Sequence, residues 1–409
     1  MVQKSVKGCE IVQNSIHYTD PACEEMCDMA QNPFKPTAGK LPPVLIGRQD
    51  IIDDFAEGLD NGAGAPGRLM LLTGQRGYGK TVMLTELGRV ARERGWEVLS
   101  ETASEGMCGR LVSALASTGP KLEEIGVSPS VGIGGVANIS LGGVRLTTPQ
   151  HDATTLRDAI ETRLGKLPKG KGILFTIDEA QAASTDDMIA LATTLQHVIR
   201  DEDMRNVGDS EKHGVAFAFA ALPSLVDELV NDKVLTFLRR AQRRELGAVP
   251  LPDVRAAYVQ TVNEAGKDIS AEDALTAARA SEGYPYMVQL VGYYMWRSAE
   301  QRGSRVIEDR DVRAGTADAA LAFEEAVCAP MFEGLTGAQR LFVEAVAADG
   351  GAPSRVSDIA ERTKRSASWV SKYRASLMKQ HVIESTGFGL VNLATPYLAK
   401  YISEHVRPQ

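Results

Sequence analysis

The feature that most constrains the fold is a glycine-rich stretch between an apolar run and a helical pattern. Residues 69–87 read LMLLTGQRGYGKTVMLTEL, and their middle fits the spacing G-x-x-x-x-G-K-[ST]. A strand that runs into such a turn and then into a helix surrounds a small concavity with backbone N–H groups and the positive end of the helix dipole. Because phosphates suit this concavity, the stretch predicts a loop that binds a nucleoside triphosphate.

The loop and the residue after it supply the candidate nucleotide-binding residues. Lys80 would bring a mobile positive charge to the β- and γ-phosphates, and the Thr81 hydroxyl would take one coordination position of Mg²⁺. The expected cofactors are therefore ATP and Mg²⁺. The full set is Gly74, Gln75, Arg76, Gly77, Tyr78, Gly79, Lys80, Thr81 and Val82.

An acidic strand end supports this interpretation. Residues 173–179 read ILFTIDE, and carboxylates at the tip of an apolar strand are costly unless a cation is near. Asp178 is placed to hold Mg²⁺ through its water shell. Glu179 is placed to orient and deprotonate the water that attacks the γ-phosphate. The alternative is an acidic strand end that caps the next helix.

Apolar runs and helical patterns alternate between about residue 37 and residue 250. Runs that are apolar throughout indicate strands buried on both faces, hence a parallel sheet between two layers of helices. The expected strands are 69–73, 96–100, 172–177, 215–222 and a weaker 243–246, with helical patterns at 82–92, 156–164 and 188–200. Residues 128–147 interrupt this rhythm and read either as an inserted β-hairpin or as a glycine-rich loop.

The length of 409 residues predicts two or three domains. We expect a flexible tail at 1–36, an α/β nucleotide-binding core at 37–247, an α-helical domain at 248–332 and a further domain at 333–409. Cys23 and Cys27, with His17 nearby, lack the second pair that a zinc site needs, so a flexible segment is the preferred reading of the tail. Five scattered cysteines favour a reducing, cytoplasmic compartment, and no apolar run is long enough for a membrane span.

The carboxy-terminal domain carries a local reversal of charge. Residues 355–380 hold seven basic and two acidic side chains, a charge of +5 in a chain of net charge −8. The order helix, turn, helix and hairpin looks like a winged helix-turn-helix, and the charge suits double-stranded DNA. Candidate contacts are Ser368, Lys372 and Arg374 on the bases and Lys364 and Arg365 on phosphates. A winged helix that binds protein is the alternative.

The chain resembles the AAA+ ATPases over most of residues 37–332. LTGQRGYGKT is similar to their Walker A loop, and ILFTIDEAQ to their Walker B strand with its catalytic glutamate. VLIGRQDIIDDF resembles the segment that lies against the adenine, which makes Ile46, Gly47 and Arg48 candidates to line the base. The resemblance implies a P-loop NTPase core, a helical lid and ATP hydrolysis.

A further resemblance concerns Arg240. The segment Leu238–Gln242 reads LRRAQ and is similar to the Ser-Arg-Cys pattern of clamp loaders, whose arginine reaches into a neighbouring subunit's nucleotide. Arg240 would then stabilise charge on the γ-phosphate of a second copy in a homo-oligomer. A basic surface helix explains the same residues equally well.

Two departures from the AAA+ pattern predict slow turnover. The fourth strand ends in Ala221 where relatives often carry a polar residue that positions the attacking water, and Ser224 lies past a proline. Residues 283–285 read Gly-Tyr-Pro where many members have a lid arginine. This resembles the Gly-x-Pro of STAND ATPases and origin-recognition-like relatives, in which the proline, here Pro285, packs near the nucleotide.

The sequence therefore predicts a slowly hydrolysing AAA+/STAND-like ATPase whose nucleotide state controls a DNA-binding winged helix. The rival hypothesis is a nucleotide-gated scaffold whose winged helix binds a protein partner. The residues do not choose among replication, mobile-element maintenance, transcription and signalling.

Overall fold

The computed structural model describes residues 9–12, 15–18, 31–37, 45–62, 65–117, 155–205, 213–223 and 240–406. It divides into two compact units. The sheet unit comprises Asp50–Gly74 and Met83–Glu245, and the helical unit comprises Met1–Gln49, Gln75–Val82 and Leu246–Gln409. The expected insert at 128–147, the cysteines Cys23 and Cys27, and Ser224 lie outside the described residues.

The sheet unit contains a five-stranded parallel sheet of order β4-β5-β6-β3-β7. The prediction of a parallel α/β core is confirmed, with strand ends shifted by one or two residues. All residues of β6 are buried, as its unbroken apolar run predicts. The strands are β3 (Leu69–Thr73), β4 (Glu97–Thr102), β5 (Gly172–Asp178), β6 (Gly214–Ala221) and β7 (Gln242–Glu245).

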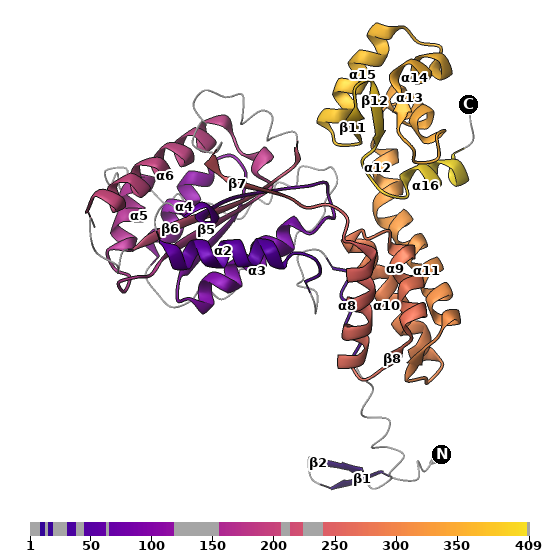
Figure 1. Cartoon of the computed structure of the whole chain (residues 1–409), viewed down its shortest axis with the longest axis horizontal. Helices are drawn as coiled ribbons and strands as arrows, with labels where there is room; N and C mark the ends of the chain where they lie inside the picture. Colours follow the sequence, from indigo (N-terminus) through magenta and orange to yellow (C-terminus); the bar gives the residue numbers. More distant parts are fainter. Residues whose placement is uncertain are drawn as a thin grey trace, which may run out of the picture. The chain divides into compact units, whose positions relative to one another are not determined.

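Helices cover both faces of this sheet (Figure 1). Apolar residues of α4, α5 and α6 form one core cluster with alternate strand residues such as Phe175 and Phe217, whose rings stack 4.6 Å apart. Helices α2 and α3 lie on the other side of the sheet (Figure 1). The bounds are α2 (Gln49–Asn61), α3 (Lys80–Glu93), α4 (Met107–Ala116), α5 (Leu156–Leu164) and α6 (Thr185–Arg205), with a short 3₁₀ turn η1 (Pro66–Arg68) before β3.

Residues 251–333 are almost entirely helical, as the sequence predicts. Two strands of two residues each, β8 and β9, pair in parallel and correct the expectation of an all-helical segment. Such short strands carry no periodicity that the sequence could reveal. The elements are α8 (Leu251–Glu264), β8 (Asp268–Ile269), α9 (Ala271–Ser281), α10 (Pro285–Gln301), β9 (Val306–Ile307), α11 (Asp309–Phe323), a π-helical turn η4 (Glu324–Cys328) and α12 (Ala329–Glu333).

The last part of the chain combines four helices with a three-stranded antiparallel sheet of order β10-β12-β11. One hydrophobic core cluster runs from Phe34 through α8–α11 to Ile402, so residues 248–332 and 333–406 share a core. The elements are α13 (Gly337–Ala347), β10 (Ser354–Arg355), α14 (Val356–Thr363), α15 (Ala367–Lys379), β11 (Ile383–Gly387), β12 (Leu390–Leu393) and α16 (Leu398–His405), the last of which the sequence does not predict.

The expected tail at 1–36 is partly structured. Two strands, β1 (Cys9–Val12) and β2 (Ser15–Tyr18), form an antiparallel hairpin. The Phe34 side chain is only 2% exposed, and its ring packs edge to face on the ring of Tyr258. The Asn32 amide donates to the Tyr293 carbonyl. The aromatic ring of Phe34 provides enough apolar area to anchor the end of this segment, so the tail as predicted is too long at its carboxyl end.

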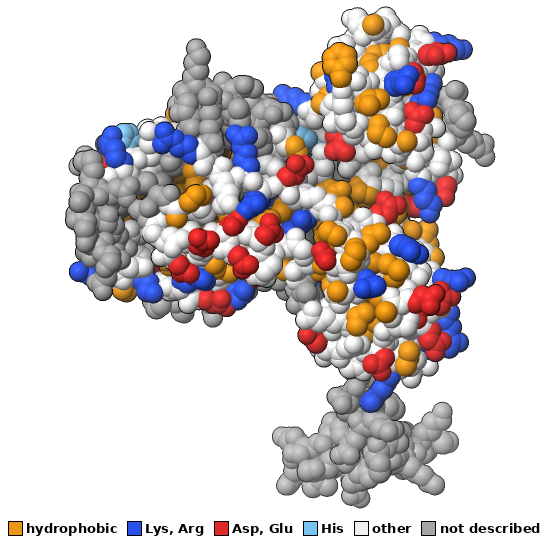
Figure 2. Space-filling view, viewed as in Figure 1, with side chains coloured by type: hydrophobic (Ala, Val, Ile, Leu, Met, Phe, Trp, Pro, Cys, Tyr) orange, Lys and Arg blue, Asp and Glu red, His pale blue; other side chains and the backbone are white. Residues whose placement is uncertain are grey.

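Surface charge is mixed on the face shown in Figure 2. Basic and acidic side chains lie among one another over the described residues of both units, as expected for 45 basic and 53 acidic residues. Within the described part of the chain, no helix has the length and apolar character that crossing a bilayer requires.

Candidate functional site

The predicted nucleotide-binding loop connects β3 to α3 and has the backbone of a tight turn. Gly77 and Gly79 have φ angles of +81° and +85°, a region that side chains with a Cβ rarely adopt. Lys80 is the first residue of α3 and is only 6% exposed. Its Nζ donates to the Gln75 carbonyl at 3.0 Å, which places the ammonium group inside the turn. Thr81 follows as an exposed residue in the first turn of α3.

Side-chain hydrogen bonds connect the loop to other segments of the helical unit. The Tyr284 hydroxyl donates to the Arg76 carbonyl at 3.0 Å. The Gln75 amide donates to the Glu384 carboxylate at 2.9 Å, and Glu384 belongs to β11. These contacts join the loop to segments that lie more than 200 and 300 residues away in the sequence.

The predicted acidic pair lies at the carboxyl end of the parallel sheet. Asp178 ends β5, and β6 separates β5 from β3, so the ends of β5 and β3 are about 10 Å apart. Glu179 follows in the left-handed region with φ of +50° and donates its N–H to the Asp178 carboxylate at 2.8 Å. A 3₁₀ turn η2 (Ala180–Ala182) begins directly afterwards. The Glu179 side chain makes no cap hydrogen bond at η2.

Gln181 connects this acidic end to β6. Its amide nitrogen donates to the Glu179 carboxylate, and its amide oxygen accepts from the Leu222 N–H at 3.2 Å. Leu222 immediately follows Ala221, the apolar position at the end of β6. A polar group therefore lies at the β6 end, contributed by a neighbouring segment rather than by β6.

The donor atoms present suit a hard divalent cation. A hydroxyl from Thr81 and a carboxylate from Asp178 are oxygen ligands of the kind that Mg²⁺ takes beside the phosphates of a bound nucleotide. That these two residues hold the metal together stays a prediction from the sequence.

The remaining predicted residues of the nucleotide site lie in separate segments. Ile46 packs against the core of the helical unit, and Arg48 donates to the Gly247 carbonyl. Pro285 is the first residue of α10, directly after Tyr284. Arg240 is exposed two residues before β7. The roles of these four residues stay predictions.

The predicted DNA-contact residues fall into two groups. Lys364 ends α14 in the left-handed conformation with φ of +52°, and Arg365, Ser368 and Lys372 are exposed at and along the amino-terminal part of α15. Arg374 lies two positions after Lys372, so about 200° further around the helix. It is half-buried and donates to the Ser385 hydroxyl of β11 at 3.4 Å.

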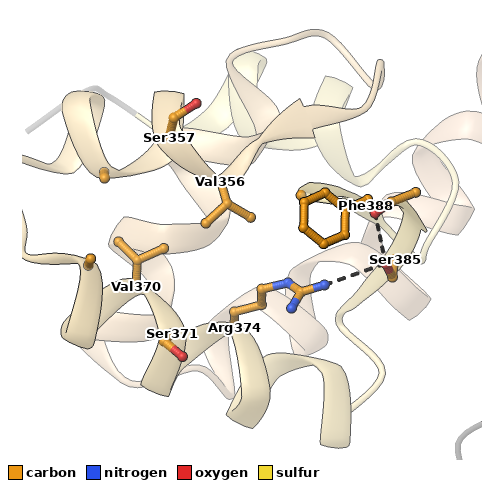
Figure 3. Close-up of a pocket in the computed structure, with 11 residues that line it drawn as sticks. Val356, Ser357, Val370, Ser371, Arg374, Ser385 and Phe388 are labelled. Carbon is orange, nitrogen blue, oxygen red and sulfur yellow. Dashed lines mark hydrogen bonds between the residues drawn. The ribbon is translucent and has the colours of Figure 1, made fainter.

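Arg374 instead lines a cavity between α14, α15 and the β11–β12 turn (Figure 3). The cavity has a volume of about 630 Å³, and Val356, Val370 and Phe388 contribute apolar surface to it. The buried Nε of Arg374 has no hydrogen-bond partner in the described part of the chain. Phe388 stands fully exposed at the hairpin turn.

Another basic residue of this region is committed to a structural contact. Arg362 makes a two-fold ion pair with Asp349 at 2.6 and 2.8 Å and donates to the Ala345 carbonyl. The Asp349 carboxylate has a lowered pKa chiefly because Arg362 donates to it. Arg362 is therefore a poor candidate for a phosphate contact, although it counts toward the local charge of +5.

Residues with contacts at these sites that were not singled out from the sequence include Gln181, Tyr284, Glu384 and Phe388. Gln181 is the polar residue two positions after Glu179, and Tyr284 is the variable residue of Gly-Tyr-Pro. Phe388 is an aromatic residue between two glycines at a hairpin turn. Position in these motifs was the available signal, but the contacts themselves depend on the fold.

Comparison with known proteins identifies two segments. Residues 44–208 match the family model for the AAA ATPase domain, and residues 325–402 match a domain of unknown function, DUF8462. No curated protein matches the chain.

Solved structures are similar to this chain to different degrees. The Aeropyrum pernix ORC2 protein, solved as ADPNP–ADP complexes, has a TM-score of 0.55 and 15% identity over 90% of this chain and 96% of that chain. The A. pernix ORC1 protein in complex with DNA has a TM-score of 0.45 and 16% identity, over 89% and 94% of the two chains. The Thermotoga maritima RuvB Holliday junction branch migration motor has a TM-score of 0.43 and 13% identity, over 92% of this chain and 100% of that chain.

The ORC2 likeness agrees with the parallel sheet and its flanking helices, and at this identity it concerns the fold alone. The family match covers the glycine-rich loop, β5 and the acidic pair at its end. Residues 44–208 are thus similar to an AAA ATPase domain, over a segment that has an α/β fold.

Proposed function

We propose that the protein is a slow ATPase in which bound ATP·Mg²⁺ controls the presentation of a carboxy-terminal DNA-binding winged helix. In this proposal, Lys80 and the loop bind the phosphates, and Thr81 and Asp178 hold Mg²⁺. Glu179 acts as the general base on the attacking water.

The observation that carries the proposed control is the contact between Gln75 and Glu384. Gln75 belongs to the loop that would hold phosphates, and Glu384 belongs to β11 of the carboxy-terminal hairpin. A polyphosphate brings negative charge to this loop and therefore disfavours a carboxylate beside it. Because a ligand shifts an equilibrium only through differential contacts, this repulsion gives ATP a means to release the hairpin.

The carboxy-terminal arrangement supports a nucleic-acid partner. Helices α14 and α15 are joined by a tight turn at Lys364–Ser366, and the β11–β12 hairpin follows, as in a winged helix-turn-helix. Val370 and Leu377 face the core, so Ser368 and Lys372 lie on the outer side of α15. A helix that presents small polar and basic side chains suits the major groove of double-stranded DNA.

Salt dependence of DNA binding tests this part of the proposal. Lys364→Ala/Arg365→Ala/Lys372→Ala should weaken binding to a labelled duplex and lower the slope of log K against log salt by about 1.8, because about 0.9 is lost for each of the two phosphate contacts, Lys364 and Arg365. Fluorescence anisotropy at several salt concentrations measures this slope.

Arg362→Ala is the matched control, since it also removes a basic residue from the same region. Its ion pair with Asp349 predicts a lower melting temperature with an unchanged salt slope. If the parent protein binds no duplex even at low salt, the scaffold hypothesis replaces DNA binding. The exposed Phe388 and the adjoining apolar cavity would then be the surface for a protein partner.

A second prediction concerns the effect of a Gln181 substitution on the rate of ATP turnover. Gln181→Ala removes the amide that orients the Glu179 carboxylate, so kcat should fall about 10- to 150-fold, as expected for loss of one hydrogen bond to a charged group. KM should change little, because the amide does not bind the nucleotide. Steady-state phosphate release measures both constants.

A double-variant cycle separates this role from simple destabilisation. Combined with Glu179→Gln, Gln181→Ala should lower kcat no further, because the group that it orients has already lost its function. Independent, additive effects of the two changes would contradict an action through Glu179.

A further inference from the structure

Tyr284 contacts the nucleotide-binding loop through a single polar atom. Its hydroxyl donates to the Arg76 carbonyl at 3.0 Å, and the residue is only 4% exposed. Burial raises the pKa of Tyr284, so the hydroxyl keeps its proton and donates over the physiological range. The loop and Tyr284 belong to the same unit of the structure.

The ring of Tyr284 is fixed on two sides. The rings of Tyr78 and Phe323 approach it edge to face, with centroid distances of 5.1 and 5.7 Å. Such pairs restrict both the position and the tilt of a ring. Phe323 ends α11, so the ring is held between the loop and the helical core.

The backbone that carries Tyr284 is equally constrained. Tyr284 precedes Pro285 at the start of α10, and proline fixes its own φ and restricts the residue before it. The Tyr284 N–H donates to the Ser281 carbonyl at 2.9 Å, and the Val249 N–H donates to the Gly283 carbonyl at 2.8 Å. The hydroxyl is therefore presented from a rigid support.

The loop is shaped to receive this hydroxyl. A Cβ built on Gly77 would lie 1.7 Å from the Tyr284 oxygen, so only glycine permits the contact. In a trans peptide the C=O of one residue points opposite to the N–H of the next. A hydrogen bond on the Arg76 carbonyl therefore directs the Gly77 N–H away from Tyr284.

We propose that Tyr284 is a positioning residue for the phosphate-binding loop: its hydroxyl fixes the Arg76–Gly77 peptide and thereby presents the Gly77 N–H to a nucleoside polyphosphate. The inference rests on nucleotide binding by this loop. Tyr284 itself needs no contact with the nucleotide, because it acts through the orientation of one peptide group.

Tyr284→Phe tests the proposal because it removes the hydroxyl and keeps the ring. The affinity for ATP·Mg²⁺ and for ADP·Mg²⁺, measured by isothermal titration calorimetry, should fall about three- to tenfold. KM for ATP should rise by a similar factor with kcat within about twofold of the parent value, since the oriented N–H binds ground state and transition state alike.

Tyr286→Phe is the matched control. Tyr286 lies two residues further along the same helix, and its ring also packs on Phe323, with a centroid distance of 5.9 Å. Loss of this hydroxyl should leave ATP affinity unchanged. The ligand-free melting temperatures of both variants should stay within about 2 °C of the parent, which a merely structural role of Tyr284 would not predict.

Two outcomes would overturn the inference. A Tyr284→Phe variant that binds ATP as tightly as the parent shows that the hydroxyl does not set the loop. A variant that loses affinity only in proportion to a lowered ligand-free melting temperature shows a structural role. If the parent itself bound no nucleotide, the proposed function would fail as well, which distinguishes that result from a failure of Tyr284 alone.

Discussion

Lys80→Ala is expected to abolish measurable ATP binding. Lys80 is buried at the start of α3 with its ammonium group directed into the turn, where it donates to the Gln75 carbonyl. A phosphate bound in this turn would gain a charge-assisted hydrogen bond that alanine cannot make. We expect affinity for ATP·Mg²⁺ to fall at least about 100-fold, or about 2.8 kcal/mol. Calorimetry and thermal shift at saturating nucleotide check this result.

The control must separate loss of binding from loss of folding. Lys267 is also buried, 8% exposed, and its Nζ donates to the Ser304 carbonyl at 2.8 Å and lies over the Trp296 ring. Lys267→Ala should lower the melting temperature yet keep the rise in melting temperature that ATP produces. A Lys80→Ala variant that still shows the parent's ATP-dependent rise would refute phosphate binding by this loop.

The parallel sheet was predictable because its central strands are apolar on both faces. The runs that become β5 and β6 contain buried residues at almost every position, so their hydrophobic pattern alone distinguishes them from half-exposed strands. The weaker β7 alternates between half-buried and exposed residues, and its sequence QRRE gives little signal. The position of β7 beside β3 is set by backbone hydrogen bonds between the two strands, and the residues of β7 alone do not indicate which strand it pairs with.

Contacts between distant segments were beyond the sequence. From the sequence, Phe34 is part of a polar tail. In the structure its ring packs against the ring of Tyr258, which lies more than 200 residues away in the chain. The same holds for Tyr284 on the Arg76 carbonyl and for Glu384 on Gln75. Each of these contacts depends on how distant elements pack in the folded chain. The loop itself depends on local backbone conformation, which a short sequence motif is enough to indicate.

The helical repeat distinguishes Arg374 from Lys372, another predicted DNA-contact residue of α15. The sequence suggested five DNA-contact candidates, but the helical repeat places Arg374 about 200° around α15 from Lys372. There it lines the cavity beside Phe388. A count of charges does not say on which face of α15 a basic residue lies. That face depends on the residue's angular position around the helix, which the count leaves out.

Glu179→Gln is expected to stop turnover while ATP still binds. Glutamine keeps the size and the hydrogen bond with Gln181 but cannot accept a proton from water. Loss of a general base typically lowers a rate by about 10²- to 10⁴-fold. Because Ala221 predicts a slow parent enzyme, single-turnover release of labelled γ-phosphate is the suitable measurement, and ATP affinity should remain within about threefold of the parent value.

Glu101→Gln supplies a carboxylate control from the neighbouring strand. Glu101 pairs in register with Ile177, one residue before Asp178, and its carboxylate forms an ion pair with Arg110 at 3.0 Å. This variant should hydrolyse ATP at the parent rate although it removes a charge close to the same end of the sheet. If Glu179→Gln also hydrolyses at the parent rate, the base lies elsewhere, and the left-handed conformation of Glu179 beside Asp178 serves only the turn into η2.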